Sequence, residues 1–206
     1  HMIISVIFVL LFLAFLMGII LVPKIDGKIN MIKVAVMGIM AIFCYQSFWA
    51  FMFQLVGIPV NLKSTCISMA AAVLLLWGTI IKKKKMQRIF VRITDIAVLA
   101  VLAGIVIAVS LHMFTPYLRL SYINSDPANH FNDAMVIVKQ GVLGKHIYFS
   151  AFVNAMFIEI FSPILIVSKY YKAFIFADIF MHVLEVWMCY VLMLTVSEKK
   201  IVRIFA

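Results

Sequence analysis

Long apolar segments constrain this chain more than any other feature. Several runs approach or exceed the about 20 residues that a helix needs to cross a bilayer. The alternating pattern of a membrane β-barrel does not accompany them. Hydrophobic residues make up 66% of the chain, charged residues 13%, and the mean hydropathy is +1.15. These values exclude the soluble globular class and predict an all-α, polytopic transmembrane helical bundle.

Six spans can be drawn on this pattern, at about 2–22, 32–59, 64–81, 93–114, 147–168 and 173–196. We expect residues 1–92 to form an N-terminal three-span bundle. Residues 93–206 would add a span, a long external loop at 115–147 and two further spans. Because residues 197–206 read as a loop entering another apolar segment, we expect the chain to be truncated.

Basic residues predict the orientation. The run of four lysines at 82–85, with Arg88 and Arg92, should be cytoplasmic, which places loop 115–147 outside. Six spans then put Lys199, Lys200 and Arg203 outside as well, against the same rule. Either the rule fails locally, or 147–168 is a re-entrant or interfacial segment; we retain six spans here.

The net charge of +10 does not indicate nucleic-acid binding. The basic residues stand mainly between apolar runs, where they contact lipid headgroups, and no aromatic-basic module accompanies them. The three cysteines, Cys44, Cys66 and Cys189, lack metal-ligand spacing, and no metal site is predicted. The lipid bilayer is therefore the partner that composition indicates.

The long polar loop carries its own helix signals. Asp126 is a favoured N-cap, and Pro127 suits the first helical position. Gly141 is a plausible stop. Between them runs an apolar stripe of Phe131, Ala134, Met135 and Val138. We expect an amphipathic helix on the outer membrane surface.

The polar face of this helix would gather Asp126, Asn129, His130 and Asp133. Two interpretations stay open. Asp126 is either only a helix cap or a functional carboxylate, and the other three are either a solvated face or part of a site. A lone histidine beside carboxylates is a weak metal signal without further ligands.

The run from Ser125 to Phe131, followed by Ala134, Gly141 and an aromatic-rich segment, resembles the first large external loop of C-type membrane glycosyltransferases, the GT-C fold. Relatives include protein mannosyltransferases and the aminoarabinose transferases of bacterial envelopes. The resemblance covers roughly 93–200. Many relatives carry a second acid where this chain has Pro127, and a proline pair common before the next span is missing at 146–148. Three spans precede the lead-in helix, where the best-known relatives have one.

The resemblance implies transfer of a sugar from a polyprenyl-phosphate donor to an acceptor at the extracytoplasmic face of the plasma (inner) membrane. Asp126, at the matching position, would be the catalytic base. Asp133, His130 and Asn129 would support it or engage a divalent cation. Arg119, Lys139 and Lys145 could pair with the donor phosphate, or they simply snorkel to the interface. As a fragment, the chain itself is expected to be inactive.

Ionisable residues inside predicted spans are further candidates because charges in a bilayer are costly unless they are paired or hydrated. Glu159 falls in the fifth segment, and Asp178, His182 and Glu185 share one face of the sixth. They could pair structurally, line a cavity or couple protons. Asp95 is interpreted as an interface residue close to Arg92. The face of Asp178, His182 and Glu185 also motivates an alternative function, a transporter or flippase. A second alternative is a non-catalytic polysaccharide-assembly subunit, in which the external helix only docks a partner.

Overall fold

A computed structural model describes residues 2–21, 28–83, 88–114, 126–144, 149–161 and 170–196. Helices and two short strands account for nearly all of these residues. In chain order they are α1 (Met2–Leu21), β1 (Lys28–Asn30), α2 (Met31–Leu55), α3 (Leu62–Lys83), β2 (Arg88–Phe90), α4 (Ile93–Phe114), α5 (Asp126–Gln140), α6 (Phe149–Phe161) and α7 (Tyr170–Val196).

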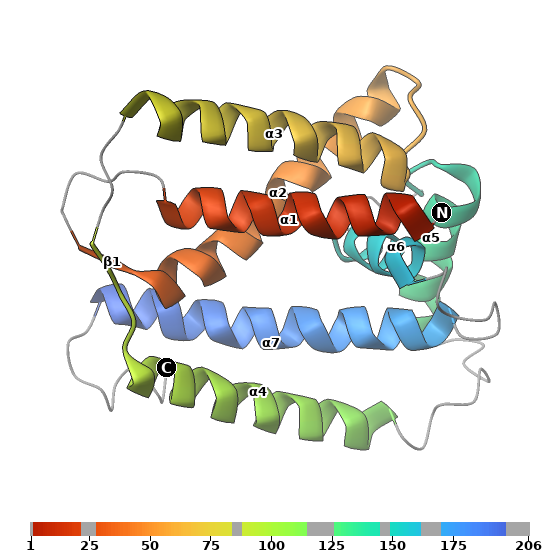
Figure 1. The fold of residues 1–206 in the computed structure, drawn as a ribbon. Helices are drawn as coiled ribbons and strands as arrows, with labels where there is room; N and C mark the ends of the chain where they lie inside the picture. Colours follow the sequence, from red (N-terminus) through yellow and green to blue (C-terminus); the bar gives the residue numbers. More distant parts are fainter. Residues whose placement is uncertain are drawn as a thin grey trace.

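Five of the helices, α1, α2, α3, α4 and α7, are long and apolar enough to cross a membrane. They contain 20 to 27 residues, which corresponds to roughly 30–40 Å of helix at about 1.5 Å per residue. Figure 1 shows α1, α3, α4 and α7 running along a common direction while α2 crosses them obliquely. The predicted class, an all-α polytopic membrane protein, is confirmed.

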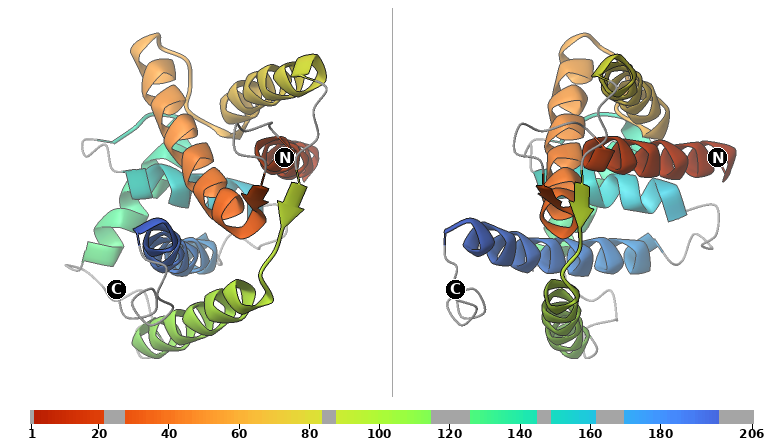
Figure 2. Two further views of the ribbon diagram at one scale, coloured as in Figure 1. Left: turned by 90° about the vertical axis from the view of Figure 1, so that its left-hand side faces the viewer. Right: turned by 60° about the vertical axis from the view of Figure 1, so that its left-hand side comes forward.

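The two ends of the bundle differ in structure. At one end β1 pairs in parallel with β2, so that Asn30 lies opposite Phe90 just before α2 and α4 begin. We call this the β end; Figure 2 shows the two strands side by side there. At the other end α5 and α6 gather beside the start of α3 and the start of α7 (Figure 1). We call this the α5 end.

Within the segment predicted as a fifth span, 147–168, the structure describes residues 149–161, which form α6, a helix of 13 residues. The rest of that segment lies outside the described residues. At about 1.5 Å per residue α6 is roughly 20 Å long, short of the ~30 Å hydrocarbon core. Seven of its residues are buried, including Phe152, Val153 and Met156. Apolar sequence was interpreted as lipid-facing, but α6 is apolar because other helices surround it.

The pairing of α4 with α7 agrees with the re-entrant alternative. Trp187 Nε1 donates to the Leu99 carbonyl at 2.9 Å, so the later half of α7 packs against the first half of α4. The two helices are therefore antiparallel, and α7 ends at the β end, beside the segment that follows the lysine run. With six spans, the basic residues after 196 would lie outside, against the positive-inside rule. With five spans they follow a helix that ends on the same side as the lysine run, and the rule is obeyed.

Asp95 forms hydrogen bonds that connect three parts of the chain at this end of the bundle. It is only 3% exposed and accepts hydrogen bonds from Asn30 Nδ2 at 3.1 Å and from the Tyr190 hydroxyl at 3.0 Å. Asn30 also caps α2 by accepting from the Ile32 amide at 3.1 Å. Asp95, interpreted as an interface residue close to Arg92, is thus also a buried acceptor whose partners come from α7 and from the residue before α2.

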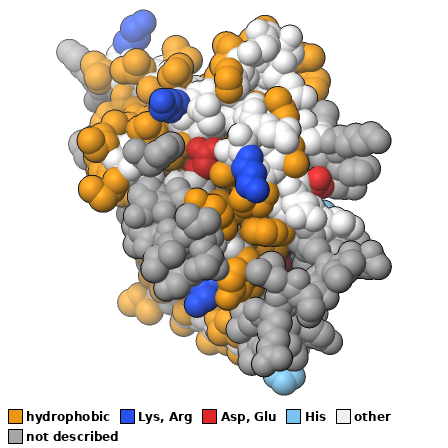
Figure 3. Space-filling model, turned by 90° about the vertical axis from the view of Figure 1, so that its right-hand side faces the viewer, with side chains coloured by type: hydrophobic (Ala, Val, Ile, Leu, Met, Phe, Trp, Pro, Cys, Tyr) orange, Lys and Arg blue, Asp and Glu red, His pale blue; other side chains and the backbone are white. Residues whose placement is uncertain are grey.

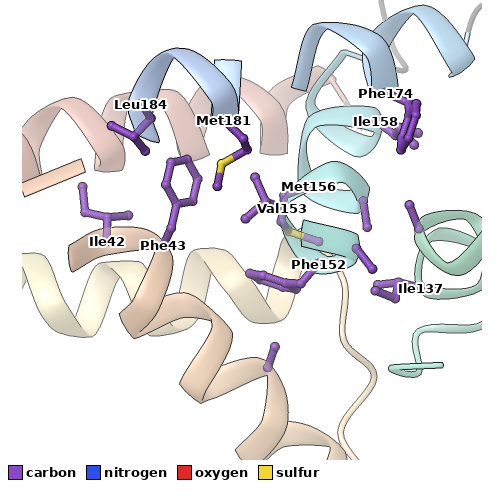
Figure 4. Packing of buried hydrophobic residues seen from close by; sticks show 14 of the residues in the cluster. Ile42, Phe43, Ile137, Phe152, Val153, Met156, Ile158, Phe174, Met181 and Leu184 are labelled. Carbon is purple, nitrogen blue, oxygen red and sulfur yellow. The ribbon is translucent and has the colours of Figure 1, made fainter. Parts of the chain in front are cut away.

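The main hydrophobic core joins the two portions of the chain. Figure 4 shows Val153 and Met156 of α6 facing Phe43 of α2 and Met181 of α7. Ile137 of α5 lies beside the same cluster. Residues from both 1–92 and 93–206 thus share one core, and α6 lies at its centre.

Candidate functional site

Helix α5 begins at Asp126 and ends at Gln140, close to the predicted boundaries. Gly141 follows with a positive φ of 67°, and its amide donates to the Ile137 carbonyl at 2.8 Å. This is the left-handed conformation that favours glycine at a helix C-terminus. The predicted stop at Gly141 is confirmed.

The apolar stripe of α5 packs on protein. Ala134 is fully buried, and Phe131, Met135 and Val138 are packed against the core cluster. The Phe131 ring meets Phe174 of α7 edge to face, with centroids 5.5 Å apart. The helix is amphipathic as predicted, but its apolar face covers α6 and α7 instead of lying on the membrane surface.

The connection between α2 and α3 holds the other end of α5 in place. Val60 donates its amide to the Gly141 carbonyl at 2.7 Å, and the Leu143 amide donates to Gln54 Oε1. A Cβ atom on Gly141 would lie 3.1 Å from Pro59 Cβ. The helix therefore has a fixed position at the α5 end.

The predicted site residues on and around α5 fall into three groups. His130 and Asp133 are half-buried, and Asn129 is exposed. Lys139 is also exposed, next to the last residue of the helix. Asp126 is the first residue of α5, but the description does not extend to its side chain. Arg119 and Lys145 lie outside the described residues.

The polar face predicted on α7 is present. His182 Nδ1 lies 2.8 Å from the Asp178 carbonyl oxygen and 3.8 Å from Asp178 Oδ2. The His182 side chain is 56% exposed and that of Asp178 31%, and Glu185 is exposed. These residues are therefore only partly covered by the described part of the chain.

The structure brings this face close to α5. Asp178 interacts electrostatically with His182 and Glu185 on its own helix and with His130 on α5. In the sequence, no pattern connects the helix of the polar loop, α5, with the ionisable face of α7. Their meeting places ionisable groups from two elements at one end of the bundle.

Glu159 is paired with a backbone group, and structural pairing was one of the roles left open for it in the sequence. Its Oε2 accepts from the Leu62 amide at 2.6 Å and so caps α3. Burial raises the pKa of Glu159 to about 7, although this hydrogen bond acts in the opposite direction. Asn61 Oδ1 adds a second cap by accepting from the Lys63 and Ser64 amides.

A polar cavity of about 370 Å³ lies at this position. Its lining comes from α1, the start of α3, α5, α6 and the start of α7: Ile4, Asn61, Leu62, Lys63, Val138, Glu159 and Tyr170. Figure 3 shows this end of the molecule, where acidic and basic side chains lie among hydrophobic ones.

Of the residues that line the cavity, only Glu159 stands out in the sequence. Lys63 and Tyr170 read as ordinary span boundaries, and nothing in their spacing relates them to residue 159. Asn61, before α3, was not singled out in the sequence. Among the described residues no group of three or more His, Cys, Asp or Glu is arranged to hold a metal ion.

No family model matches this chain, and no match was found among curated proteins or solved structures. The resemblance to C-type glycosyltransferases therefore rests on the sequence motifs within 93–200 alone.

Proposed function

We propose that this chain is part of a membrane glycosyltransferase that transfers a sugar from a polyprenyl-phosphate donor to an acceptor on the extracytoplasmic face of the plasma membrane. One observation supports the proposal most. The helix that begins at Asp126 packs against α6 and α7, and its His130 is close enough to Asp178 for the two to interact electrostatically. Concentrated ionisable groups at one membrane surface suit acid–base chemistry better than simple anchoring.

The proposed reaction needs a carboxylate at the acceptor. As the acceptor hydroxyl oxygen attacks the anomeric carbon, Asp126 takes the hydroxyl proton, and the lipid phosphate leaves with the electrons of the glycosidic bond. Cations near the departing phosphate would stabilise its charge. Lys63 and Lys139 are both exposed near this end of the bundle.

His130 and Asp178 would act as positioning residues. Because His130 of α5 interacts electrostatically with Asp178 of α7, it would help to keep the polar face of α5 turned towards the acceptor. Asp133, half-buried on the same helix, would support this face. This arrangement assigns the chemistry to Asp126 and the geometry to its neighbours.

The test is a transfer assay in membranes that contain the product of the complete open reading frame, with radiolabelled polyprenyl-phosphate sugars as donors. The wild type is compared with Asp126→Asn and with Asn132→Gln, a neutral change at an exposed position of the same helix. We expect Asp126→Asn to lower transfer by about 10²-fold or more, the scale of a lost general base. Asn132→Gln should leave transfer unchanged.

Equal transfer by the wild type and Asp126→Asn would remove Asp126 from the mechanism. Absence of transfer with every donor would overturn the glycosyltransferase proposal. The transporter alternative would then gain weight, because His182 and Glu185 are exposed on a membrane-spanning helix. That alternative predicts that His182→Gln abolishes substrate uptake.

A further inference from the structure

A second, apolar hollow lies near the polar cavity. It has a volume of about 230 Å³. It is lined by Met2, Ser5, Val6, Val9 and Leu10 of α1 and by Ile160 and Phe161 of α6. Ile4 and Glu159 line the polar cavity, and each is the chain neighbour of a residue that lines the apolar hollow. Both hollows therefore border the first half of α1 and the end of α6.

The polar cavity presents complementary charges. Lys63 is exposed at its rim, and Glu159 lies half-buried in its wall with Tyr170 nearby. The first amides of α3 are already taken, Leu62 by Glu159 and Lys63 by Asn61. Recognition must therefore come from side chains, with the ammonium of Lys63 suited to a phosphate and the acceptor oxygens of Glu159 suited to hydroxyl donors.

The apolar hollow suits a hydrocarbon chain. Its wall on α1 consists of exposed side chains of a membrane-spanning helix, among them Met2 at 65% and Leu10 at 60% exposure. Phe161 closes the opposite wall beside Phe176 of α7, with ring centroids 5.7 Å apart. Inside a bilayer these side chains face lipid, so packing contacts, and not the removal of apolar surface from water, would hold a hydrocarbon chain here.

One class of ligand fits both hollows. Sugar hydroxyls could donate to the carboxyl oxygens of Glu159, whereas a phosphate alone offers mainly acceptor oxygens. A volume of about 370 Å³ falls within the ~300–1,000 Å³ typical of small-molecule sites and admits a group larger than phosphate. The apolar hollow then takes the lipid.

We propose that α1, α3, α6 and α7 form a binding site for a lipid-linked sugar phosphate, with the headgroup in the cavity of Lys63, Glu159 and Tyr170 and the first part of the hydrocarbon chain along Val6 and Phe161. The choice of a lipid-linked sugar as the occupant rests on the proposed function. The site itself uses α1 and α3, which lie outside the region of family resemblance.

The test measures binding of a radiolabelled polyprenyl-phosphate hexose to the purified chain in nanodiscs. Two variants address the two parts of the site: Lys63→Gln removes the cation, and Val6→Trp fills the apolar hollow. Each has a matched control. Lys82→Gln changes an exposed lysine at the other end of α3, and Val101→Trp adds the same bulk at an exposed position of α4.

We expect Lys63→Gln and Val6→Trp each to weaken binding by about tenfold or more, the scale of one lost charge-assisted contact. Both controls should bind as the wild type does. Phosphatidylglycerol, added as competitor, should displace the labelled lipid poorly because it lacks the sugar. All variants should unfold at the wild-type temperature, since the replaced side chains are exposed.

Wild-type binding by both site variants would overturn the proposal, as would displacement by phosphatidylglycerol at equal concentration. These results are separable from the transfer assay. If transfer occurs and requires Asp126 while both site variants bind normally, the function stands and this site is wrong. If no donor supports transfer but Lys63→Gln and Val6→Trp still lose binding, the site stands and the function is wrong.

Discussion

Gly141 illustrates what a single residue decides in this protein. Its φ of 67° and the nearby Pro59 leave little room for a side chain. We expect Gly141→Ala to lower the free energy of unfolding by about 1–2 kcal/mol, the cost of a left-handed conformation in an L-residue. Thermal unfolding in detergent checks this prediction.

Two other glycines serve as controls for that prediction. Gly57 also has a positive φ, of 74°, but a Cβ atom added there would have no neighbouring atom within 4 Å. Gly57→Ala should therefore lower the free energy of unfolding only by the cost of the left-handed backbone conformation. Gly104 lies in α4 with open space around it, and Gly104→Ala should unfold at or above the wild-type temperature. Equal unfolding temperatures for the Gly141 and Gly104 variants would contradict this explanation.

Asp95 acts at the same scale but through hydrogen bonds. Asp95→Ala would leave Asn30 Nδ2 and the Tyr190 hydroxyl without this buried acceptor. We expect a loss of about 1–3 kcal/mol for each donor left unsatisfied, and a smaller loss for Tyr190→Phe. Chemical denaturation of the variants in micelles measures these differences.

Arg92→Ala is the control for Asp95. Arg92 is exposed, and its loss should change stability by less than about 0.5 kcal/mol, as for most surface substitutions. If Arg92→Ala proves as damaging as Asp95→Ala, the charge near the start of α4 matters more than the buried hydrogen bonds do.

At the scale of the element, α5 and α6 depend on each other. Ala134 of α5 is fully buried, so a larger side chain would push the helix away from the core. We expect Ala134→Leu to lower the free energy of unfolding by about 1–3 kcal/mol through overpacking. The measurement is thermal unfolding, with Asn132→Leu at an exposed position of α5 as the control.

If α5 were an interfacial helix with its apolar face in lipid, Ala134→Leu would be neutral or favourable, because lipid accommodates the extra carbons. The difference between lipid and protein surroundings also explains why α6 was predicted as a span. Apolar residues look alike in sequence whether lipid or protein surrounds them, and only the 13-residue length of α6 separates the two cases.

At the scale of the whole molecule, the arrangement of five long helices predicts which positions face the same side of the membrane. In a background without Cys44, Cys66 and Cys189, we would place single cysteines at Lys82, Val196, Lys63 and Lys139. We expect a membrane-impermeant thiol reagent to label Lys82→Cys and Val196→Cys from one side. Lys63→Cys and Lys139→Cys should react from the other side, because α3 and α7 each span the bilayer.

Labelling of Val196→Cys together with Lys63→Cys would mean that α6 and its flanking segments cross the membrane after all. The positive-inside tendency favours the five-span arrangement, since it places the end of α7 with the lysine-rich segment. Reagent added to sealed, right-side-out vesicles distinguishes the two topologies directly.

Local chemistry alone determined several features of this protein. The length of the apolar runs established the membrane class and the positions of five spans with little error. The pair Asp126 and Pro127 marked the start of α5, and Gly141 marked its end, because helix boundaries depend on neighbouring residues and on the conformation a glycine permits.

Only the tertiary structure decided the rest. Whether α6 crosses the bilayer, what Asp95 bonds to, and that His130 meets Asp178 all depend on residues distant in the chain. Glu159 and the Leu62 amide, for example, are 97 residues apart. No local pattern relates such positions, because their contact follows from how the helices pack. The candidate site is therefore predictable residue by residue but not as an arrangement.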